Sequence, residues 1–120
     1  MKELTKAEEM VMQALWKIEK GFAKEIIEEI EYDEKKPAYN TVLTILRILV
    51  EKGFVKYETY GKSFQYYPVY SKEEYSRSTL DSIMQRYFNG SAKSLLSFLA
   101  KDKKMNMKDL EEIINDLKKK

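Results

Sequence analysis

The hydrophobic period of the chain changes at Gly53, and this change limits the possible folds more than any other feature. Between Pro37 and this glycine, the stretch AYNTVLTILRILVEK has apolar residues at helical spacing, which predicts a helix over about 38–52. After it, FVKYETYGKSFQYYPV alternates with the period of a β-strand and has Gly61 at its turn. The sequence therefore predicts a helix followed directly by a β-hairpin that stops near Pro68.

Two shorter helical segments precede this pair. Thr5 and Glu8 have the spacing of a capping box, and apolar residues then follow at helical spacing up to Gly21, which suits a C-terminal cap. Residues 23–30 repeat the pattern, with isoleucines on one side and glutamates on the other. Three helices followed by a hairpin are the order of a helix-turn-helix with a wing, so we expect a winged helix.

The second half of the chain is predicted to be helical. Ser71 and Glu74 form a second capping box at the start of one helix, and two shorter helices follow, of which the last begins at Asn106. We therefore expect a mainly α fold with a small β-hairpin wing. The step at PVYSKEE divides it into a winged-helix DNA-binding domain at 1–70 and a helical dimerisation domain of three helices at 71–120.

The composition argues against most enzyme classes. The 120 residues include no Cys and no His, which removes disulfides, thiolate nucleophiles, the usual metal ligands and the commonest general acid-base side chain. No apolar run approaches the roughly 20 residues that cross a bilayer, and the start MKELTKAEEM lacks the apolar core of a secretory signal. We expect a cytoplasmic protein that is not an enzyme, needs no metal or cofactor and does not insert into a membrane.

The polar start of the helix at 38–52 is the candidate binding surface. In a helix-turn-helix the second helix presents its first residues to base edges in the major groove, and its later turns anchor it in the core. Asn40 suits adenine, while tyrosine and threonine hydroxyls suit phosphate and threonine methyls suit thymine. The alternative is that Asn40 and Thr41 merely cap and decorate a core helix. The predicted DNA-binding residues, including one on the wing, are Ala38, Tyr39, Asn40, Thr41, Thr44, Arg47 and Lys62.

Charge supports this surface locally and not globally. The net charge is +2, and residues 1–70 have eleven basic against twelve acidic side chains. Residues 35–62, however, have six basic side chains against two acidic ones, a local charge of +4. Lys62 at the hairpin turn is the best single wing contact, although a merely solvated turn lysine is an equally simple interpretation. A basic patch on the helix and wing is expected of a duplex-binding protein, because phosphate neutralisation provides most non-specific affinity.

The apolar stripes of the helical second half need a partner, because a unit of about fifty residues buries too little surface alone. A second copy of the chain is the simplest partner, and two-fold symmetry would place two recognition helices about 34 Å apart, or a multiple of that, on a palindromic operator. The alternative is that the stripes fold back on the winged helix within one monomer. The predicted dimer contacts are Leu80, Ile83, Met84, Tyr87, Phe88, Leu95, Leu99, Leu110, Ile113 and Ile114.

Five segments follow one another in a recognisable order: LTKAEEMVMQALWK, AKEIIEEI, AYNTVLTILRILVEKGFV, GKSFQYYPV and SKEEYSRS. Their order and spacing resemble those of the penicillinase-repressor (BlaI/MecI/CopY) family of bacterial transcription regulators, over essentially the whole chain. The resemblance implies a dimeric repressor that binds double-stranded DNA at a palindromic operator through the winged helix and dimerises through the C-terminal helices.

The resemblance also bears on how the DNA would be released. In the antibiotic-responsive branch, a membrane sensor with a zinc protease domain signals β-lactam, and the repressor is cleaved in its dimerisation domain. The corresponding bond here joins Ser97 to Phe98, where those relatives commonly have Asn before the Phe. The copper-responsive branch carries C-terminal cysteines, and a chain without cysteine cannot sense copper by that route.

A competing hypothesis makes the chain a winged-helix protein–protein interaction module without specific DNA binding. It is motivated by the weak global charge and by the nine tyrosines, which are common in protein interfaces.

Overall fold

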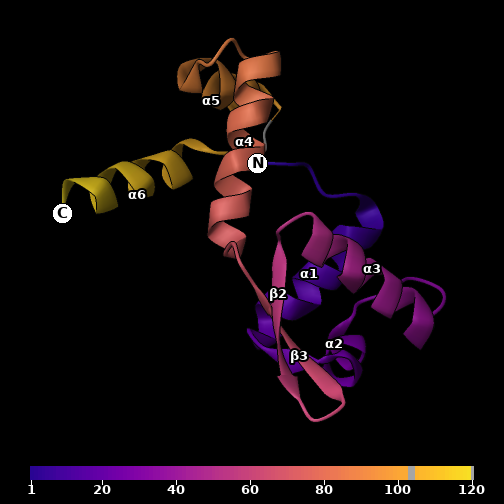
Figure 1. The fold of residues 1–120 in the computed structure, drawn as a ribbon. Helices are drawn as coiled ribbons and strands as arrows, with labels where there is room; N and C mark the ends of the chain where they lie inside the picture. The colour runs from indigo at the N-terminus through magenta and orange to yellow at the C-terminus, as the bar shows by residue number, and fades with distance from the viewer. Residues whose placement is uncertain (103–104, 120) are drawn as a thin grey trace. The chain divides into compact units, whose positions relative to one another are not determined.

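The computed structural model of the chain describes residues 1–102 and 105–119. It confirms the predicted class, a mainly α fold with a small antiparallel sheet of strand order β1-β3-β2 (Figure 1). The elements in chain order are α1 (Lys6–Ile18), β1 (Gly21–Phe22), α2 (Ala23–Glu29), α3 (Tyr39–Glu51), β2 (Val55–Tyr60), β3 (Ser63–Pro68), α4 (Lys72–Tyr87), α5 (Ala92–Lys101) and α6 (Met107–Lys118).

The chain divides into two compact units, residues 1–78 and 79–120. The first turns of α4 belong to the first unit because Tyr75 is buried there, with its ring centroid 5.9 Å from Trp16 and 5.8 Å from Phe54. The Tyr75 hydroxyl also accepts a hydrogen bond of 2.9 Å from the Leu4 amide. The expected domain division at residue 70 stays a prediction.

The start of α1 follows the predicted capping box, whereas its end does not follow the prediction. The Thr5 amide donates to Glu8 Oε1 at 2.9 Å, and the Glu8 amide donates to Thr5 Oγ1 at 3.2 Å. The expected cap at Gly21 is wrong, because α1 ends at Ile18 and Glu19 takes the positive φ of 69°. Gly21 instead begins β1, where a Cβ atom would lie only 2.5 Å from Ile18 Cδ1. A side chain at this position would therefore require the end of the flexible Ile18 side chain to move.

Two glycines mark the transition from α3 to the hairpin. Gly53 follows the C-terminal cap of α3 with a φ of +83°, and Gly61 forms the hairpin turn with a φ of +60°. Both values lie in the left-handed region that glycine adopts at little cost. In the hairpin Tyr57 pairs with Tyr66 and Thr59 with Phe64, so these four side chains share one face of the sheet.

The core of the first unit lies among α1, α2, α3 and the sheet. Its elements pack in this way because the apolar stripe of each helix meets those of the others, which removes these side chains from water. The largest fully buried side chains are Phe54, Met12, Leu15, Ile26, Leu46, Leu49, Val11, Val42 and Val55.

One buried carboxylate joins the start of α1 to the end of α3. Glu8 is only 5% exposed, and its Oε1 accepts from Lys52 Nζ at 2.6 Å. Burial by itself raises the pKa of Glu8, but the hydrogen bonds from Lys52 and Thr5 outweigh this effect and lower that pKa below its ordinary value. Lys52 was counted with the basic stretch at 35–62, and this ion pair removes it from the surface charge that DNA would meet.

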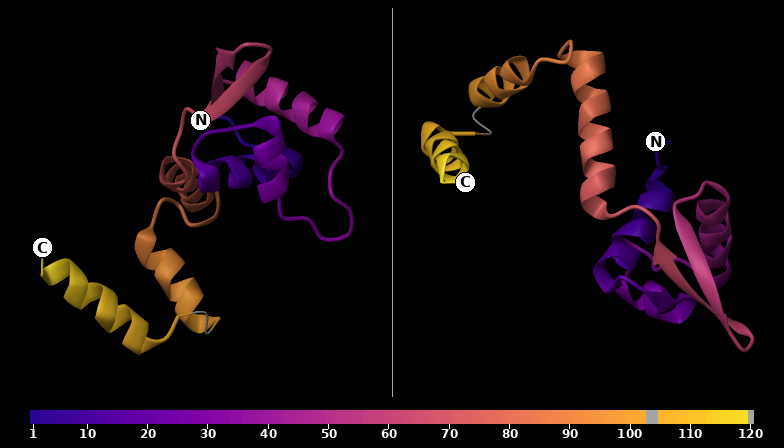
Figure 2. Two further views of the ribbon diagram at one scale, coloured as in Figure 1. Left: turned by 90° about the horizontal axis from the view of Figure 1, so that it is seen from below. Right: turned by 60° about the vertical axis from the view of Figure 1, so that its left-hand side comes forward.

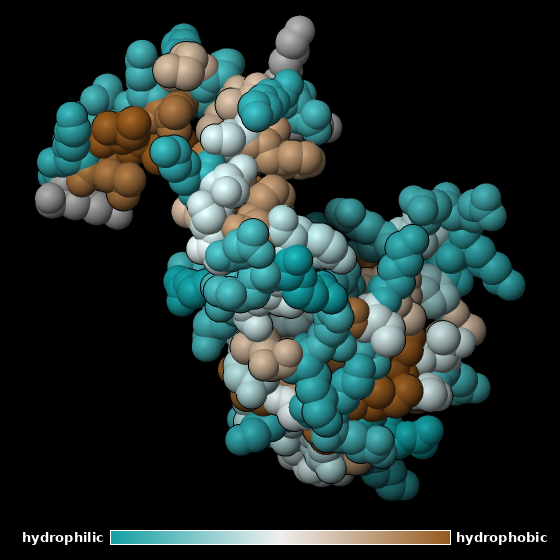
Figure 3. Space-filling view, turned by 90° about the horizontal axis from the view of Figure 1, so that it is seen from above, coloured by the Kyte–Doolittle hydropathy of each residue, from teal (hydrophilic) through white to brown (hydrophobic). Residues whose placement is uncertain are grey.

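The second unit has regular helices but no buried side chain among its described residues. The Asn-Gly turn ends α4 with positive φ at both residues, Ser91 caps α5 and Asn106 caps α6 through side-chain hydrogen bonds of 3.1 and 2.8 Å. Hydrophobic side chains gather instead on its surface (Figure 3). In the described part of the chain, no helix is long and apolar enough to span a bilayer.

Candidate nucleic-acid interface

The two sides of α3 differ in polarity and exposure. Val42, Ile45, Leu46 and Leu49 are buried in the core, which anchors the helix. The predicted recognition residues all lie on the solvent side, and those on α3 or at its cap are Ala38, Tyr39, Asn40, Thr41, Thr44 and Arg47. A helix held along one stripe and polar along the other presents side chains in fixed positions.

The polar residues at the start of α3 are not occupied in capping the helix. The N-cap is Ala38, whose side chain makes no capping hydrogen bond. The side chains of Asn40 and Thr41 make no hydrogen bond with another described residue, whereas Thr44 Oγ1 donates to the Asn40 carbonyl at 3.0 Å. The capping part of the alternative is therefore wrong, whereas its other part, that these residues merely decorate a core helix, stays untested. Thr44 retains only acceptor capacity for a ligand.

An open groove of about 1100 Å³ lies between the exposed face of α3 and the hairpin. The two elements are neighbours in the fold (Figure 1, Figure 2). Five of the predicted DNA-binding residues line the groove together: Tyr39, Asn40, Thr44, Arg47 and Lys62. Ala38 and Thr41 are exposed but do not line it.

The groove carries cations that have no partner within the protein. Lys24, Arg47 and Lys62 form no ion pair with any other described residue. Lys24 was not among the predicted contacts, because the sequence indicated only that the outer side of residues 23–30 is rich in glutamate. Two carboxylates also line the groove, and one of them, Glu25, accepts a hydrogen bond of 2.9 Å from the Phe22 amide.

The outer face of the hairpin is held by a further ion pair. Lys20 Nζ lies 3.1 Å from Glu58 Oε1, and the Tyr60 hydroxyl donates to Glu58 Oε2 at 3.0 Å. The hydrogen bond from Lys20, followed by that from Tyr60, lowers the pKa of Glu58. This carboxylate is thus partly neutralised, and it repels an approaching polyanion less than a free one does.

Six aromatic side chains make up much of the groove wall, and the sequence analysis assigned only Tyr39 among them to the site. They are Phe22, Tyr39, Tyr57, Tyr60, Phe64 and Tyr66. The tyrosine count of the chain was used instead to motivate the protein–protein interaction hypothesis, although the strand period of the hairpin segment places Tyr57 and Thr59 on one face. Burial raises the pKa of Tyr66, so its phenol stays neutral in neutral solution.

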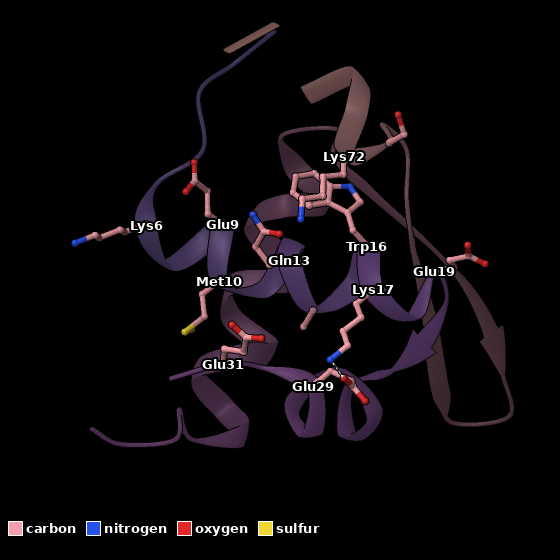
Figure 4. Close-up of a pocket in the computed structure, with 12 residues that line it drawn as sticks. Lys6, Glu9, Met10, Gln13, Trp16, Lys17, Glu19, Glu29, Glu31 and Lys72 are labelled. Atoms are coloured by element: carbon pink, nitrogen blue, oxygen red, sulfur yellow. Dashed lines mark ion pairs between the residues drawn. The ribbon is translucent and has the colours of Figure 1, made fainter. Parts of the chain in front are cut away.

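A second hollow, of about 740 Å³, runs along α1. Its lining mixes both signs of charge, and Figure 4 shows Lys17 pointing to Glu29, with an Nζ–Oε2 distance of 3.1 Å. The other acidic side chains around it are Glu9, Glu19 and Glu31. Within the described residues no group of acidic side chains could hold a metal ion. Acidic side chains outnumber basic ones around this hollow, four to three, whereas basic side chains outnumber acidic ones around the groove at α3, three to two.

Three helices, a paired hairpin and a polar groove beside the second helix of the helix-turn-helix define a winged-helix protein. The model of the penicillinase repressor family matches residues 4–119, and the chain belongs to that family of DNA-binding transcriptional repressors. The family consists of repressors and not of enzymes, which confirms both the resemblance and the expectation that the chain is not an enzyme.

Individual relatives are similar along most of the chain. The methicillin resistance regulatory protein MecI of Staphylococcus aureus strain N315 is 29% identical over 118 residues, covering 98% of this chain and 95% of that protein. The penicillinase repressor of Bacillus licheniformis is 29% identical over 103 residues, covering 83% and 78%. The solution structure of the DNA binding domain of the repressor BlaI is 28% identical with a TM-score of 0.51, covering 62% of this chain and 94% of that one.

Proposed function

We propose that the chain is a sequence-specific repressor that acts as a homodimer on a palindromic DNA operator. The observation that carries this proposal is the groove beside α3, where the free side chain of Asn40 lies with Arg47 and Lys62, two cations without a partner among the described residues. A surface of this kind suits a ligand that offers base edges and phosphates together.

In the proposed complex the first half of α3 enters the major groove. Asn40 donates to and accepts from adenine, while Tyr39 and Thr41 contact phosphate or a thymine methyl group. Arg47 and Lys62 neutralise phosphates beside the major groove, and this binding is sequence-independent. Repression follows because an occupied operator blocks transcription of the adjoining gene.

The dimer part of the proposal rests on the exposed apolar side chains of the second unit. Of the predicted contacts, Leu80, Tyr87, Ile113 and Ile114 are exposed by 42–69%. Six others are half-buried: Ile83, Met84, Phe88, Leu95, Leu99 and Leu110. Further exposed apolar side chains that the prediction did not include are Leu96, Met107 and Leu117. A second copy that covers these residues would remove them from water.

Derepression by proteolysis is the regulatory part of the proposal. The Ser97–Phe98 bond lies inside α5, and both residues are exposed. Phe98 also packs on Phe88 with ring centroids 5.6 Å apart, so a cut there separates two parts of the second unit. We propose a membrane sensor-protease as the source of the cut and the cytoplasm as its place. A chain nicked after Ser97 should elute as a monomer on a sizing column; a nicked dimer would contradict this part.

Selection of bound duplexes from a random-sequence pool, near physiological salt, tests the central proposal. The expected result is a palindromic consensus bound by two chains, with the stoichiometry read from the mass of the complex. Absence of any enriched sequence would contradict the proposal and favour the protein–protein interaction module.

Variants on α3 and on the wing separate base reading from phosphate contact. Asn40→Ala and Thr41→Ala should change the preferred bases, whereas Lys62→Ala should weaken binding to every duplex alike and make the salt slope shallower by about one unit. Lys93→Ala, on the exposed side of α5, is the matched charge control and should leave base preference unchanged. Equal losses on all sequences for Asn40→Ala, Thr41→Ala and Lys62→Ala would remove base reading by α3.

A further inference from the structure

An exposed aromatic surface on the hairpin is not explained by core packing or by base recognition through α3. The rings of Tyr57 and Phe64 have centroids 4.6 Å apart, and the two residues are 46% and 44% exposed. The buried Tyr66 completes the group, with its ring centroid 6.0 Å from that of Tyr57 and 6.3 Å from that of Phe64. We refer to Tyr57, Phe64 and Tyr66 as the wing aromatic face.

The register of the hairpin directs this face into the groove beside α3. Tyr57 lies opposite Tyr66 and Thr59 lies opposite Phe64, so all of these side chains stand on the same side of the sheet. All three aromatic residues of the face line the groove, together with the recognition residues on α3. Whatever occupies the groove therefore meets rings on one wall and polar side chains on the other.

The chemistry of the groove matches one component of double-stranded DNA. Large aromatic rings left half in water indicate a surface that a partner covers. Arg47 and Lys62 line the same groove and pair with no other described residue. A sugar–phosphate strand alternates the C–H faces of deoxyribose with anionic phosphates, which is complementary to aromatic rings interspersed with cations.

Resting on the proposed function, we infer that the groove holds one sugar–phosphate strand of the bound duplex. If the start of α3 lies in the major groove, the cleft beside it faces the strand that borders the major groove. Deoxyribose rings pack on Tyr57 and Phe64, and the phosphates between them meet Arg47 and Lys62. The wing aromatic face then supplies a share of the affinity that releases no counterions and does not depend on salt.

Binding of the full chain to its selected duplex, measured over a series of salt concentrations, tests this inference. Phe64→Ala should lower the affinity about tenfold at every salt concentration and leave the slope of log K against log salt unchanged. Phe64→Thr removes the ring but introduces a β-branched residue, which suits a strand better than alanine does, and it should give the same loss with less disturbance of the hairpin. Tyr32→Ala removes a tyrosine that is 51% exposed outside the groove and should bind as wild type.

Hydroxyl-radical cleavage locates the contact, because the radical attacks the deoxyribose itself. The wild-type chain should protect sugars on the strand that borders the major-groove site, and Phe64→Thr should lose that protection while keeping the same base consensus. Wild-type affinity in both Phe64 variants, or unchanged sugar protection, would overturn the inference and leave the proposed function intact. Failure of the wild-type chain to bind any duplex would instead overturn the proposed function, and this inference with it.

Discussion

The two units of the chain use apolar side chains in opposite ways. In residues 1–78 sixteen apolar side chains are buried, whereas in the described part of residues 79–120 none is buried. Exposed side chains such as Tyr87, Phe98 and Leu117 are 53–69% accessible instead. The first unit is therefore a finished fold within one chain, whereas the second has an exposed apolar surface that a second copy would cover in the proposed dimer.

The largest expected effect lies in the core of the first unit. Leu46 is fully buried on α3, and Leu46→Ala should lower the free energy of unfolding by about 2–5 kcal/mol because it leaves a cavity. Ile48, two residues along the same helix and 36% exposed, is the matched control, and Ile48→Ala should cost less than about 1 kcal/mol. Urea unfolding measures both, and equal losses would break the contrast between the two sides of α3.

A charge placed on the apolar surface of the second unit should weaken the association of two chains into the proposed dimer. Ile113→Glu on α6 should weaken the dimer by about 3 kcal/mol, more than a hundredfold, because an unpaired carboxylate would be buried at the interface. Sedimentation should then give the mass of one chain, while the first unit melts as in wild type. Asp116→Ala on the same helix is the control and should stay dimeric. A dimer that survives Ile113→Glu would place the contact elsewhere.

A smaller effect is expected at the buried carboxylate of the first unit. Glu8→Gln should reduce stability at neutral pH by about 1–3 kcal/mol, because it leaves Lys52 without its charged partner. The folded-state pKa of Glu8 is lowered, so the contribution is complete above the unfolded value of about 4.5 and disappears as pH falls through the folded value. Urea unfolding at pH 7 and in acid should show that the difference in the free energy of unfolding between wild type and Glu8→Gln shrinks as the pH falls. A difference that does not depend on pH would contradict the stabilising role of the ion pair.

The sequence predicted the elements that have strong local patterns. The capping boxes at Thr5 and Ser71 form in the structure, and so do the helix 38–52 and the hairpin. Strand β1 was not predicted, because a strand of two residues has too few positions to show a period. The cap at Gly21 was wrong because Glu19 adopts a positive φ itself, which residue type alone does not reveal.

The sequence predicted the site residues on α3, but it predicted only some of the residues that surround them. Helical spacing separates Asn40 and Arg47 from the buried positions, so their exposure follows from local sequence. The charge of the groove does not follow from local sequence, because Lys52 pairs with a residue 44 positions away and Lys24 lines the groove from a different helix. Such long-range pairings depend on the tertiary fold and leave no periodic trace in the sequence.

The most direct test of the account compares affinity for the selected palindrome with affinity for a single half-site, using the full chain. If the first unit reads DNA and the second joins two copies, the palindrome should bind at least about a hundredfold more tightly, because the second contact becomes intramolecular. Equal affinity for both duplexes would contradict the division of roles between the two units.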